Sequence, residues 1–289
     1  MEVEILETTR SQAKRRGKPR KKRLLQRVLQ ADPAQTYLLY VPSSRGAEPP
    51  IIVSAHGVSR NADEHARLLS AYCEIYGAVL VVPQFSIEEY PDYQRLGRTG
   101  RGKRADIALN LIVAEAAAAT GASGERFHLF GFSGGAQFAH RYTMAHPHRV
   151  ASAVFASAGW YTLPDPTIRF PYGTRPTRRL PGLRFDAEEF LSVPMKVIVG
   201  AKDDESKGLR RSQRLDRDQG VSRIERARRW VAAMNAAAEA HQVESMVSYE
   251  ELENCDHSFR RSILRSGLGD RVFEAMFGPP PESAQAIEG

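Results

Sequence analysis

Cysteines and long apolar runs are scarce in this sequence. Among its 289 residues only Cys73 and Cys255 are cysteines. They are too few for a disulfide framework and are not spaced as a metal site, so we expect two reduced structural thiols. No stretch approaches the roughly 18 consecutive apolar residues of a membrane-spanning helix. Residues 1–10 carry three glutamates and lack the apolar run of a secretory signal, so we expect a cytoplasmic protein without a transmembrane segment.

Positive and negative charges balance along the chain, except in one N-terminal segment. Residues 1–27 contain ten lysines or arginines and three glutamates, and so carry the whole net charge of +7. Gly17 and Pro19 interrupt this segment, and we expect a basic, flexible N-terminal arm. Such an arm would attract an anionic partner, such as RNA or an anionic lipid surface, weakly and without sequence preference. A solvated tail without a partner is the alternative.

The remaining composition is that of an ordinary soluble domain, with 42% hydrophobic and 26% charged residues. From residue 35 onward, β-rich runs alternate with helical runs. This alternation predicts an α/β fold, in which helices flank a mostly parallel central sheet on both faces. The predicted strands are 37–41, 51–55, 78–82, 127–130, 150–156, 195–199 and 245–249, and the main predicted helices are 62–76, 105–119, 136–145 and 223–240.

We expect one domain over residues 28–277, followed by a flexible tail at 278–289. Within the domain, residues 160–191 interrupt the alternation with prolines and arginines, over a length that a connection between strand and helix does not need. This segment is predicted to be a cap-like insertion over the carboxyl edge of the sheet. Trp160 and Tyr161 in the insertion, together with Phe132, are the candidate substrate-binding residues.

The sharpest motif is GFSGG, from Gly131 to Gly135, between a predicted strand and a predicted helix. A nucleophilic serine in a tight strand-to-helix turn needs very small residues two positions before and after it, because a side chain there would clash with the turn. Its position before a helix also directs backbone N–H groups at a developing oxyanion. The motif predicts that Ser133 is a catalytic nucleophile.

A serine hydroxyl needs a base to take its proton, and the base needs a carboxylate to orient it. Of the histidines after Ser133, only His257 occupies a loop between the last predicted strand and a following helix, so we predict that it is the base. Asp203 follows a buried strand and the turn at Gly200, which favours it as the acid. Asp204 is the alternative acid, whereas Asp256 is expected to cap its own loop.

The loop after the strand 51–55 is expected to supply the second oxyanion donor. Gly57 lets the chain turn close to the substrate, and the backbone N–H groups of Val58 and Gly134 form the predicted oxyanion hole. His56 lies before the serine in the chain, and we expect it to make structural hydrogen bonds rather than to catalyse.

One further segment resembles a phosphate-binding loop but is set aside. Residues 97–104 nearly match that motif, yet Arg104 stands where a serine or threonine must bind magnesium, and no strand runs directly into the segment. We expect a basic surface loop on the same edge as the catalytic loops. No metal site or cofactor is predicted.

Four segments together resemble the polyhydroxybutyrate depolymerase and feruloyl esterase branch of the α/β-hydrolases, with dienelactone hydrolases as more distant relatives. They are 36–42 (TYLLYVP), 56–62 (HGVSRNA), 131–135 (GFSGG) and 255–259 (CDHSF). The resemblance spans about residues 35–265. It implies the α/β-hydrolase fold and a Ser-Asp-His triad that acts on esters through an acyl-enzyme without a cofactor. The insertion has no specific match, so the polymer substrate is not carried over.

The expected function is therefore that of a serine hydrolase that cleaves carboxylic esters. Thioesterase, amidase or peptidase activity would use the same three residues. A different kind of alternative is a non-catalytic hydrolase-like protein that binds an anionic partner through its basic arm. The sequence indicates neither the acyl and alcohol groups of the substrate nor the oligomeric state.

Overall fold

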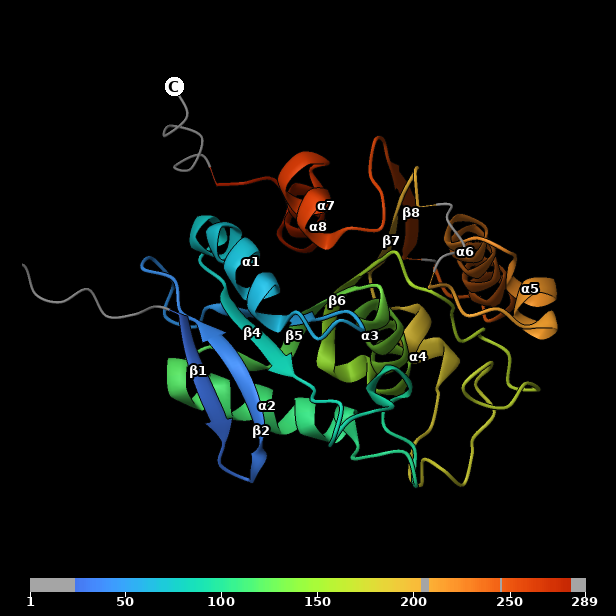
Figure 1. Cartoon of the computed structure of the whole chain (residues 1–289), viewed down its shortest axis with the longest axis horizontal. Helices are drawn as coiled ribbons and strands as arrows, with labels where there is room; N and C mark the ends of the chain where they lie inside the picture. Colours follow the sequence, from blue (N-terminus) through green and yellow to red (C-terminus); the bar gives the residue numbers. More distant parts are fainter. Residues whose placement is uncertain (1–23, 204–207, 245, 282–289) are drawn as a thin grey trace, which may run out of the picture.

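The computed structural model describes residues 24–203, 208–244 and 246–281. Over these residues, eight strands form one sheet in the order β1-β2-β4-β3-β5-β6-β7-β8 (Figure 1). The strands are β1 (Leu24–Leu29), β2 (Asp32–Tyr40), β3 (Pro50–Ala55), β4 (Val79–Gln84), β5 (Ser123–Phe132), β6 (Val150–Ala156), β7 (Met195–Gly200) and β8 (Val247–Leu252).

Helices connect the strands. They are α1 (Ala62–Tyr76), α2 (Ala105–Thr120), α3 (Gly134–Ala145), α4 (Ala187–Leu191), α5 (Gln213–Gln219), α6 (Arg223–Ala240), α7 (Phe259–Arg265) and α8 (Leu268–Phe277), with short 3-10 turns at η1 (Tyr93–Arg95) and η2 (Pro147–Arg149). The four main predicted helices are present as α1, α2, α3 and α6. Their ends follow the expected signals: α1 stops at the left-handed Gly77, and α6 starts where the Ser222 side chain accepts the Glu225 N–H. No helix in the described ranges is long and apolar enough to cross a membrane.

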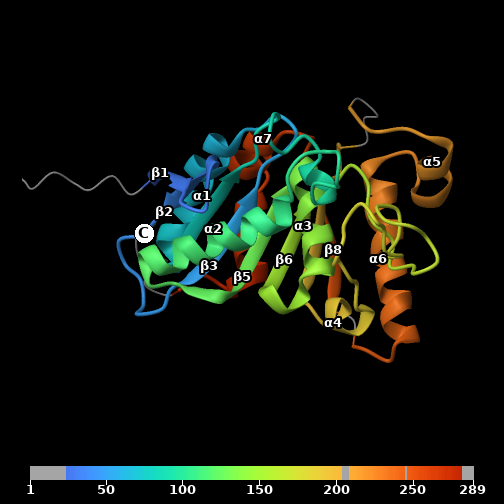
Figure 2. The same ribbon diagram turned by 90° about the horizontal axis from the view of Figure 1, so that it is seen from below.

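The sheet is parallel from β4 to β8, and only β1 and β2 are antiparallel to their neighbours. Successive strand residues point to opposite faces, so Ile52 packs toward α1, α7 and α8 while Val53 packs toward α2, α3 and α6. Figure 2 shows α2, α3 and α6 on one face of the sheet and α1 and α7 on the other. The predicted α/β class and its mostly parallel sheet are confirmed.

The N-terminal boundary differs from the prediction. The basic arm was expected to reach residue 27, but β1 already begins at Leu24 and pairs with β2, with Leu24 opposite Tyr40 and Arg27 opposite Tyr37. Pairing with β1 satisfies backbone groups that would otherwise leave β2 as an open edge. The arm prediction was therefore wrong for residues 24–27, while residues 1–23 lie outside the described part of the chain.

The predicted insertion at 160–191 is largely irregular, but its last turn belongs to the main fold. Residues 187–191 form helix α4, whose N-terminus is capped by the Asp186 side chain. Phe190 and Leu191 are buried in the same core cluster as α3 and α6, because α4 packs between those two helices. The irregular part of the insertion therefore ends at Asp186 rather than at Leu191.

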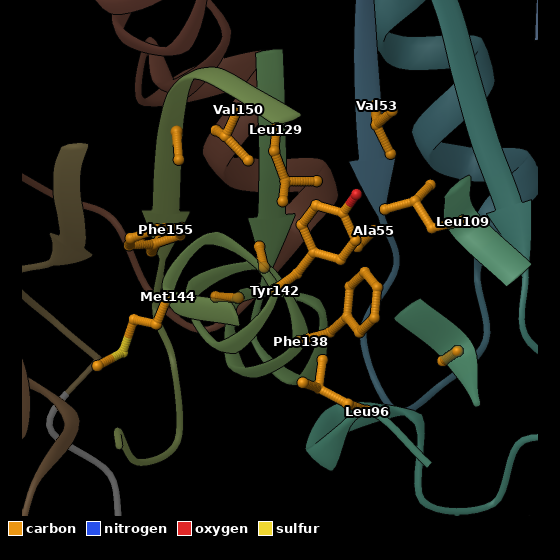
Figure 3. Packing of buried hydrophobic residues seen from close by; sticks show 14 of the residues in the cluster. Val53, Ala55, Leu96, Leu109, Leu129, Phe138, Tyr142, Met144, Val150 and Phe155 are labelled. Atoms are coloured by element: carbon orange, nitrogen blue, oxygen red, sulfur yellow. The ribbon is translucent and has the colours of Figure 1, made fainter. Parts of the chain in front are cut away.

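Helix α3 is anchored in the core by two aromatic residues. Phe138 and Tyr142 are fully buried, and Figure 3 shows them packed with Ala55 of β3 and Leu96. The Phe138 ring lies 5.1 Å from that of Phe85, a distance typical of stabilising aromatic pairs. Since α3 begins one residue after Ser133, this packing fixes the direction in which the turn at the end of β5 leaves the sheet.

Candidate active site

Ser133 is the single residue between the end of β5 and the start of α3. Its backbone has φ = 55° and ψ = −114°, a combination that a residue with a side chain rarely adopts. The turn is held from both sides, because the Ser133 N–H donates to Ala156 O at 2.8 Å and its carbonyl accepts the Gln137 N–H at 3.2 Å. Strain of this kind persists only where the surroundings impose it, and it is concentrated at functional sites.

Two glycines of the motif are required by the close approach of the backbone. A Cβ at Gly131 would lie 2.3 Å from Gly135 O, and a Cβ at Gly135 would lie 1.9 Å from Ala55 O. Neither neighbour is a flexible side-chain end, so neither clash is relieved by a rotamer change. The predicted reason for small residues two positions before and after the serine is therefore confirmed by these distances.

The substitution Gly135→Ala tests this packing. We expect it to lower the free energy of unfolding by at least about 3 kcal/mol, or to prevent folding, because α3 and β3 must separate to admit the methyl group. Urea denaturation followed by circular dichroism measures the change. Gly46→Ala is the matched control, since a Cβ there would meet no atom within 4 Å. Equal stability of the two variants would show that the backbone approach is not as close as described.

The structure brings Ser133, His257 and Asp203 together from three distant parts of the chain. Ser133 Oγ lies 2.9 Å from His257 Nε2, and His257 Nδ1 lies 2.7 Å from Asp203 Oδ2. An ionised carboxylate only accepts hydrogen bonds, so Nδ1 of the imidazole donates to Asp203 and Nε2 is left to accept the serine hydroxyl. The three residues form one directed chain of hydrogen bonds.

Among the described residues, Asp203 is the carboxylate that is hydrogen-bonded to the His257 imidazole. Its turn is closed by the Asp203 N–H donating to Gly200 O at 2.9 Å, and the Lys202 N–H donates to Cys255 O at 2.9 Å. The acid loop is thus fixed against the loop that carries His257. Asp256 instead pairs with Arg261, whose guanidinium holds the pKa of that carboxyl below its usual value. Asp204, the alternative acid, lies outside the described residues.

Arg223 is a residue of the site that the sequence did not reveal. It is 3% exposed, and its Nη1 donates to Asp203 Oδ1 at 3.0 Å, so each carboxylate oxygen of Asp203 has a partner. Arg223 is the first residue of α6, a position where the helix dipole disfavours a cation. That unfavourable position was the one available signal that the arginine has another role.

The loop after β3 lies against the serine turn, as predicted. The ideal Cβ position of Gly57 is 3.7 Å from Ser133 Cβ, and that of Gly134 is 2.8 Å from Val58 Cγ1. Val58 and Gly134, the predicted oxyanion donors, are therefore neighbours. Tyr93 Oη and Gln94 Nε2 approach the same Gly134 position to 2.9 and 3.0 Å. The sequence placed Tyr93 and Gln94 on the same edge of the sheet as the catalytic loops, but it gave them no role, because they belong to no recognisable motif.

His56 makes structural hydrogen bonds. It is 1% exposed, its Nδ1 lies 2.9 Å from Gly57 O, and its Nε2 accepts the Phe85 N–H at 3.1 Å. These partners fix the neutral form with the proton on Nδ1. Burial lowers the pKa of His56 to about 4. The ring therefore ties the loop after β3 to the segment after β4, which supports the structural role expected for it.

Buried neutral histidines make the fold sensitive to acid. Burial lowers the pKa of His56 and of His128 to about 4, against an ordinary value of 6.5. Between these two pH values the unfolded chain binds more protons than the folded one, so stability present above pH 6.5 is lost as the pH falls toward 4. For His56, which is 1% exposed, this corresponds to a fall of ~3 kcal/mol in the free energy of unfolding measured by urea denaturation. The partly buried His128 is expected to contribute less.

One substitution tests the contribution of His128 to the loss of stability in acid, and a second serves as its control. His128→Gln removes one of the titrating groups and is expected to flatten the fall in stability between pH 6.5 and pH 4. His148→Gln alters an exposed residue and is expected to leave the curve unchanged. A wild-type stability that stays level from pH 7 to pH 4.5 would contradict the burial argument.

The three predicted substrate-binding residues have different surroundings. Phe132 is 5% exposed, and its ring lies 5.4 Å from the His257 ring, beside the serine turn. Tyr161 is a core residue, stacked on Trp230 with ring centroids 5.0 Å apart and 1% exposed. Its assignment to substrate binding was wrong, because the insertion turns this ring into the sheet-facing core. Trp160 is buried beneath arginine side chains, with the Arg141 guanidinium 4.1 Å from its ring centre.

Comparison with known proteins identifies the fold. No protein-family model matches the chain, and no match was found among curated proteins. A solved poly(aspartic acid) hydrolase from Sphingomonas sp. KT-1 is similar, with TM-score 0.71 and 24% identity over 83% of this chain and 94% of its own. A poly(3-hydroxybutyrate) depolymerase from Bordetella parapertussis has TM-score 0.71 and 25% identity, over 88% of this chain and 87% of its own.

The chain therefore has the α/β-hydrolase fold. A protein described as a dienelactone hydrolase from Klebsiella pneumoniae is also similar, with TM-score 0.51 and 16% identity over 84% of this chain and 92% of its own. The resemblance inferred from the motifs is confirmed, since polyhydroxybutyrate depolymerase and dienelactone hydrolase structures are among the neighbours. Several structures that share this fold are described as hydrolases or esterases.

Proposed function

We propose that this protein is a serine hydrolase that cleaves carboxylic esters, with Ser133 as nucleophile, His257 as base and Asp203 as the orienting acid. The observation that carries the proposal is the directed hydrogen-bond chain from Ser133 Oγ to His257 and on to Asp203, at distances of 2.9 and 2.7 Å. The position of Ser133 on a strained turn before a helix adds support, because such a turn exposes the hydroxyl beside backbone N–H groups. The similarity to solved hydrolases and esterases points in the same direction.

In the proposed reaction, Ser133 Oγ attacks the ester carbonyl carbon while His257 Nε2 accepts the hydroxyl proton. Asp203 keeps the proton on Nδ1 and stabilises the imidazolium that forms. The oxyanion accepts hydrogen bonds from the N–H groups of Val58 and Gly134; the first N–H groups of a helix have no intrahelical acceptor. His257 then gives its proton to the leaving alcohol, and water releases the acyl group with the imidazole again as base. No metal or cofactor takes part in this proposal.

Labelling with a fluorophosphonate probe, combined with hydrolysis of nitrophenyl esters, tests the proposal. The wild type is expected to be labelled and to turn over the esters. Ser133→Ala is expected to abolish labelling and to lower kcat by at least about 10⁴-fold, because the nucleophile is lost. Failure of folded wild-type protein to react with the probe would reject the catalytic proposal.

The acid is tested in the same assay with a neighbouring control. Asp203→Asn is expected to lower kcat by about 10³- to 10⁴-fold, because an amide favours the wrong imidazole tautomer. Asp204→Asn is the matched control and is expected to retain most of the activity. The reverse outcome would transfer the role of acid to Asp204.

Arg223 is proposed as a positioning residue that acts through Asp203. Arg223→Gln is expected to lower kcat by about 10- to 100-fold, the equivalent of one charge-assisted hydrogen bond, with KM changed less than about twofold. The acidic limb of the pH profile of kcat should also move to higher pH, because an unneutralised carboxylate favours the protonated imidazole. Arg223→Lys keeps the charge and should restore much of the rate. An unchanged pH profile in Arg223→Gln would contradict this role.

Two alternatives remain distinguishable by experiment. The same three residues would serve a thioesterase, amidase or peptidase, and one similar structure is described as a poly(aspartic acid) hydrolase. Rates on ester, thioester and amide substrates with the same acyl group separate these reactions. A non-catalytic protein that binds RNA or anionic vesicles would lose that binding when residues 1–23, which precede β1, are deleted, and would not react with the fluorophosphonate. The cytoplasmic location and the weak anionic partner of the arm stay predictions.

A further inference from the structure

An arginine-lined pocket lies outside the group formed by Ser133, His257 and Asp203. It has a volume of about 330 Å³. Seven residues from three separate segments line it, and five of them are arginines: Arg95, Arg98, Arg101, Pro171, Tyr172, Arg179 and Arg210. The segment after β4 and the insertion are joined at this place, because the Thr99 N–H donates to Arg179 O at 2.8 Å. The pocket therefore belongs to the folded domain rather than to a loose loop.

The positive charge of the pocket is only partly balanced. Asp92 is 6% exposed and pairs with both Arg95 Nη1 at 2.6 Å and Arg98 Nε at 2.7 Å. In the described ranges, the guanidinium groups of the three other arginines have no carboxylate within 4.0 Å; these are Arg101, Arg179 and Arg210. Like charges held this close destabilise one another unless an anion lies among them.

A buried sixth arginine lies next to the pocket arginines. Arg141 is 0% exposed, and within the described part of the chain its Nη2 has no hydrogen-bond partner. Its guanidinium stacks on Trp160 at 4.1 Å, while Arg95 and Arg210 lie 5.5 and 5.7 Å from the same ring centre. Burial lowers the pKa of Arg141, and the charges of Arg95, Arg98 and Arg210 lower it further. A buried polar group without a partner is costly, so this cluster favours an anion nearby.

The segment after β4 reaches both the proposed oxyanion site and the pocket. Gln94 Nε2 lies 3.0 Å from the ideal Cβ position of Gly134, and the next residue, Arg95, lines the pocket. Consecutive Cα atoms are 3.8 Å apart. The Gln94 carbonyl also accepts a hydrogen bond from Arg141 Nη1 at 2.6 Å. Neighbouring residues of one segment therefore contact the proposed oxyanion site and line the pocket.

We propose that the arginine-lined pocket binds an oxyanion group, a carboxylate or a phosphate, on the substrate whose ester bond lies at Ser133. Arginine guanidinium groups match the geometry of both oxyanions and form charge-assisted hydrogen bonds with them. The inference rests on the proposed function and narrows its substrate class to acidic esters. It also assigns a role to the insertion, which supplies Pro171, Tyr172 and Arg179 to the pocket.

Two pairs of esters that differ by one carboxylate test the proposal. Monomethyl adipate against methyl hexanoate places the charge on the acyl side, and 6-acetoxyhexanoate against hexyl acetate places it on the alcohol side. We expect the acidic member of at least one pair to have a kcat/KM at least about tenfold higher, the effect of one charge-assisted hydrogen bond. The double variant Arg179→Gln/Arg210→Gln should remove this preference while changing kcat/KM on the neutral esters less than about twofold.

Arg178→Gln is the matched control, because Arg178 is an exposed arginine of the same insertion that does not line the pocket. It should retain the preference for the acidic ester. An equal rate on the acidic and neutral members of both pairs, or a preference that survives in the double variant, would overturn the proposal while leaving the hydrolase intact.

Calorimetric titration separates failure of the pocket from failure of the proposed function. Adipate and inorganic phosphate are titrated into the wild type and the double variant, which needs no catalysis. Binding of either anion to the wild type that is lost in the double variant supports the pocket even if no ester is hydrolysed, and the tighter anion identifies the oxyanion. Absence of binding of both anions to the wild type, together with normal hydrolysis of neutral esters, rejects the anion site.

Discussion

The close approach of the α3 N-terminus to the end of β3 is the constraint on which the rest of the site depends. The backbone of α3 at Gly135 packs directly against the Ala55 carbonyl. A Cβ at residue 135 would lie 1.9 Å from that oxygen, so only glycine fits there. This contact brings the loop after β3, with Gly57 and Val58, beside the serine turn. The same contact helps to impose the strained conformation of Ser133, because α3 is held in place by the core rather than by the turn itself.

Charge at the site is controlled by pairing rather than by exposure to water. Asp203 is 1% exposed, and a buried carboxylate is costly unless both oxygens are hydrogen-bonded. His257 and Arg223 each pair with one oxygen, so both oxygens have a partner and the orientation of the carboxylate is fixed. Removing one partner from such a buried group is typically far more destabilising than the pair is stabilising. The arginine therefore restricts how the acid loop can move, and through it the imidazole.

The sequence predicted the parts of the fold and site that depend on local pattern. Alternating strands and helices predicted the parallel sheet, and GFSGG with the order of Asp203 and His257 predicted the three residues that meet. Strand β1 was missed because its basic flanking sequence resembles a solvated arm, whereas its pairing with β2 depends on a partner several residues away. Tyr161 was misassigned for a similar reason, since only the packing of the insertion against Trp230 decides where that ring points.

The arginine-lined pocket could not be predicted, because it arises from three segments that meet only in the folded chain. Residues 97–104 carried a basic pattern without a partner, and for the arginines of the insertion a solvated surface was favoured over contact with a carboxylate or phosphate of the substrate. Trp160 explains the position of Arg95 and Arg210, two of the five arginines that line the pocket. Its ring stacks with the buried Arg141, and Arg95 and Arg210 gather around the same ring. A flat aromatic ring attracts guanidinium groups by cation–π interaction, which offsets part of their mutual repulsion before any anion binds. The same ring anchors the insertion to α3, so the residue that organises the pocket also determines where the pocket lies relative to Ser133.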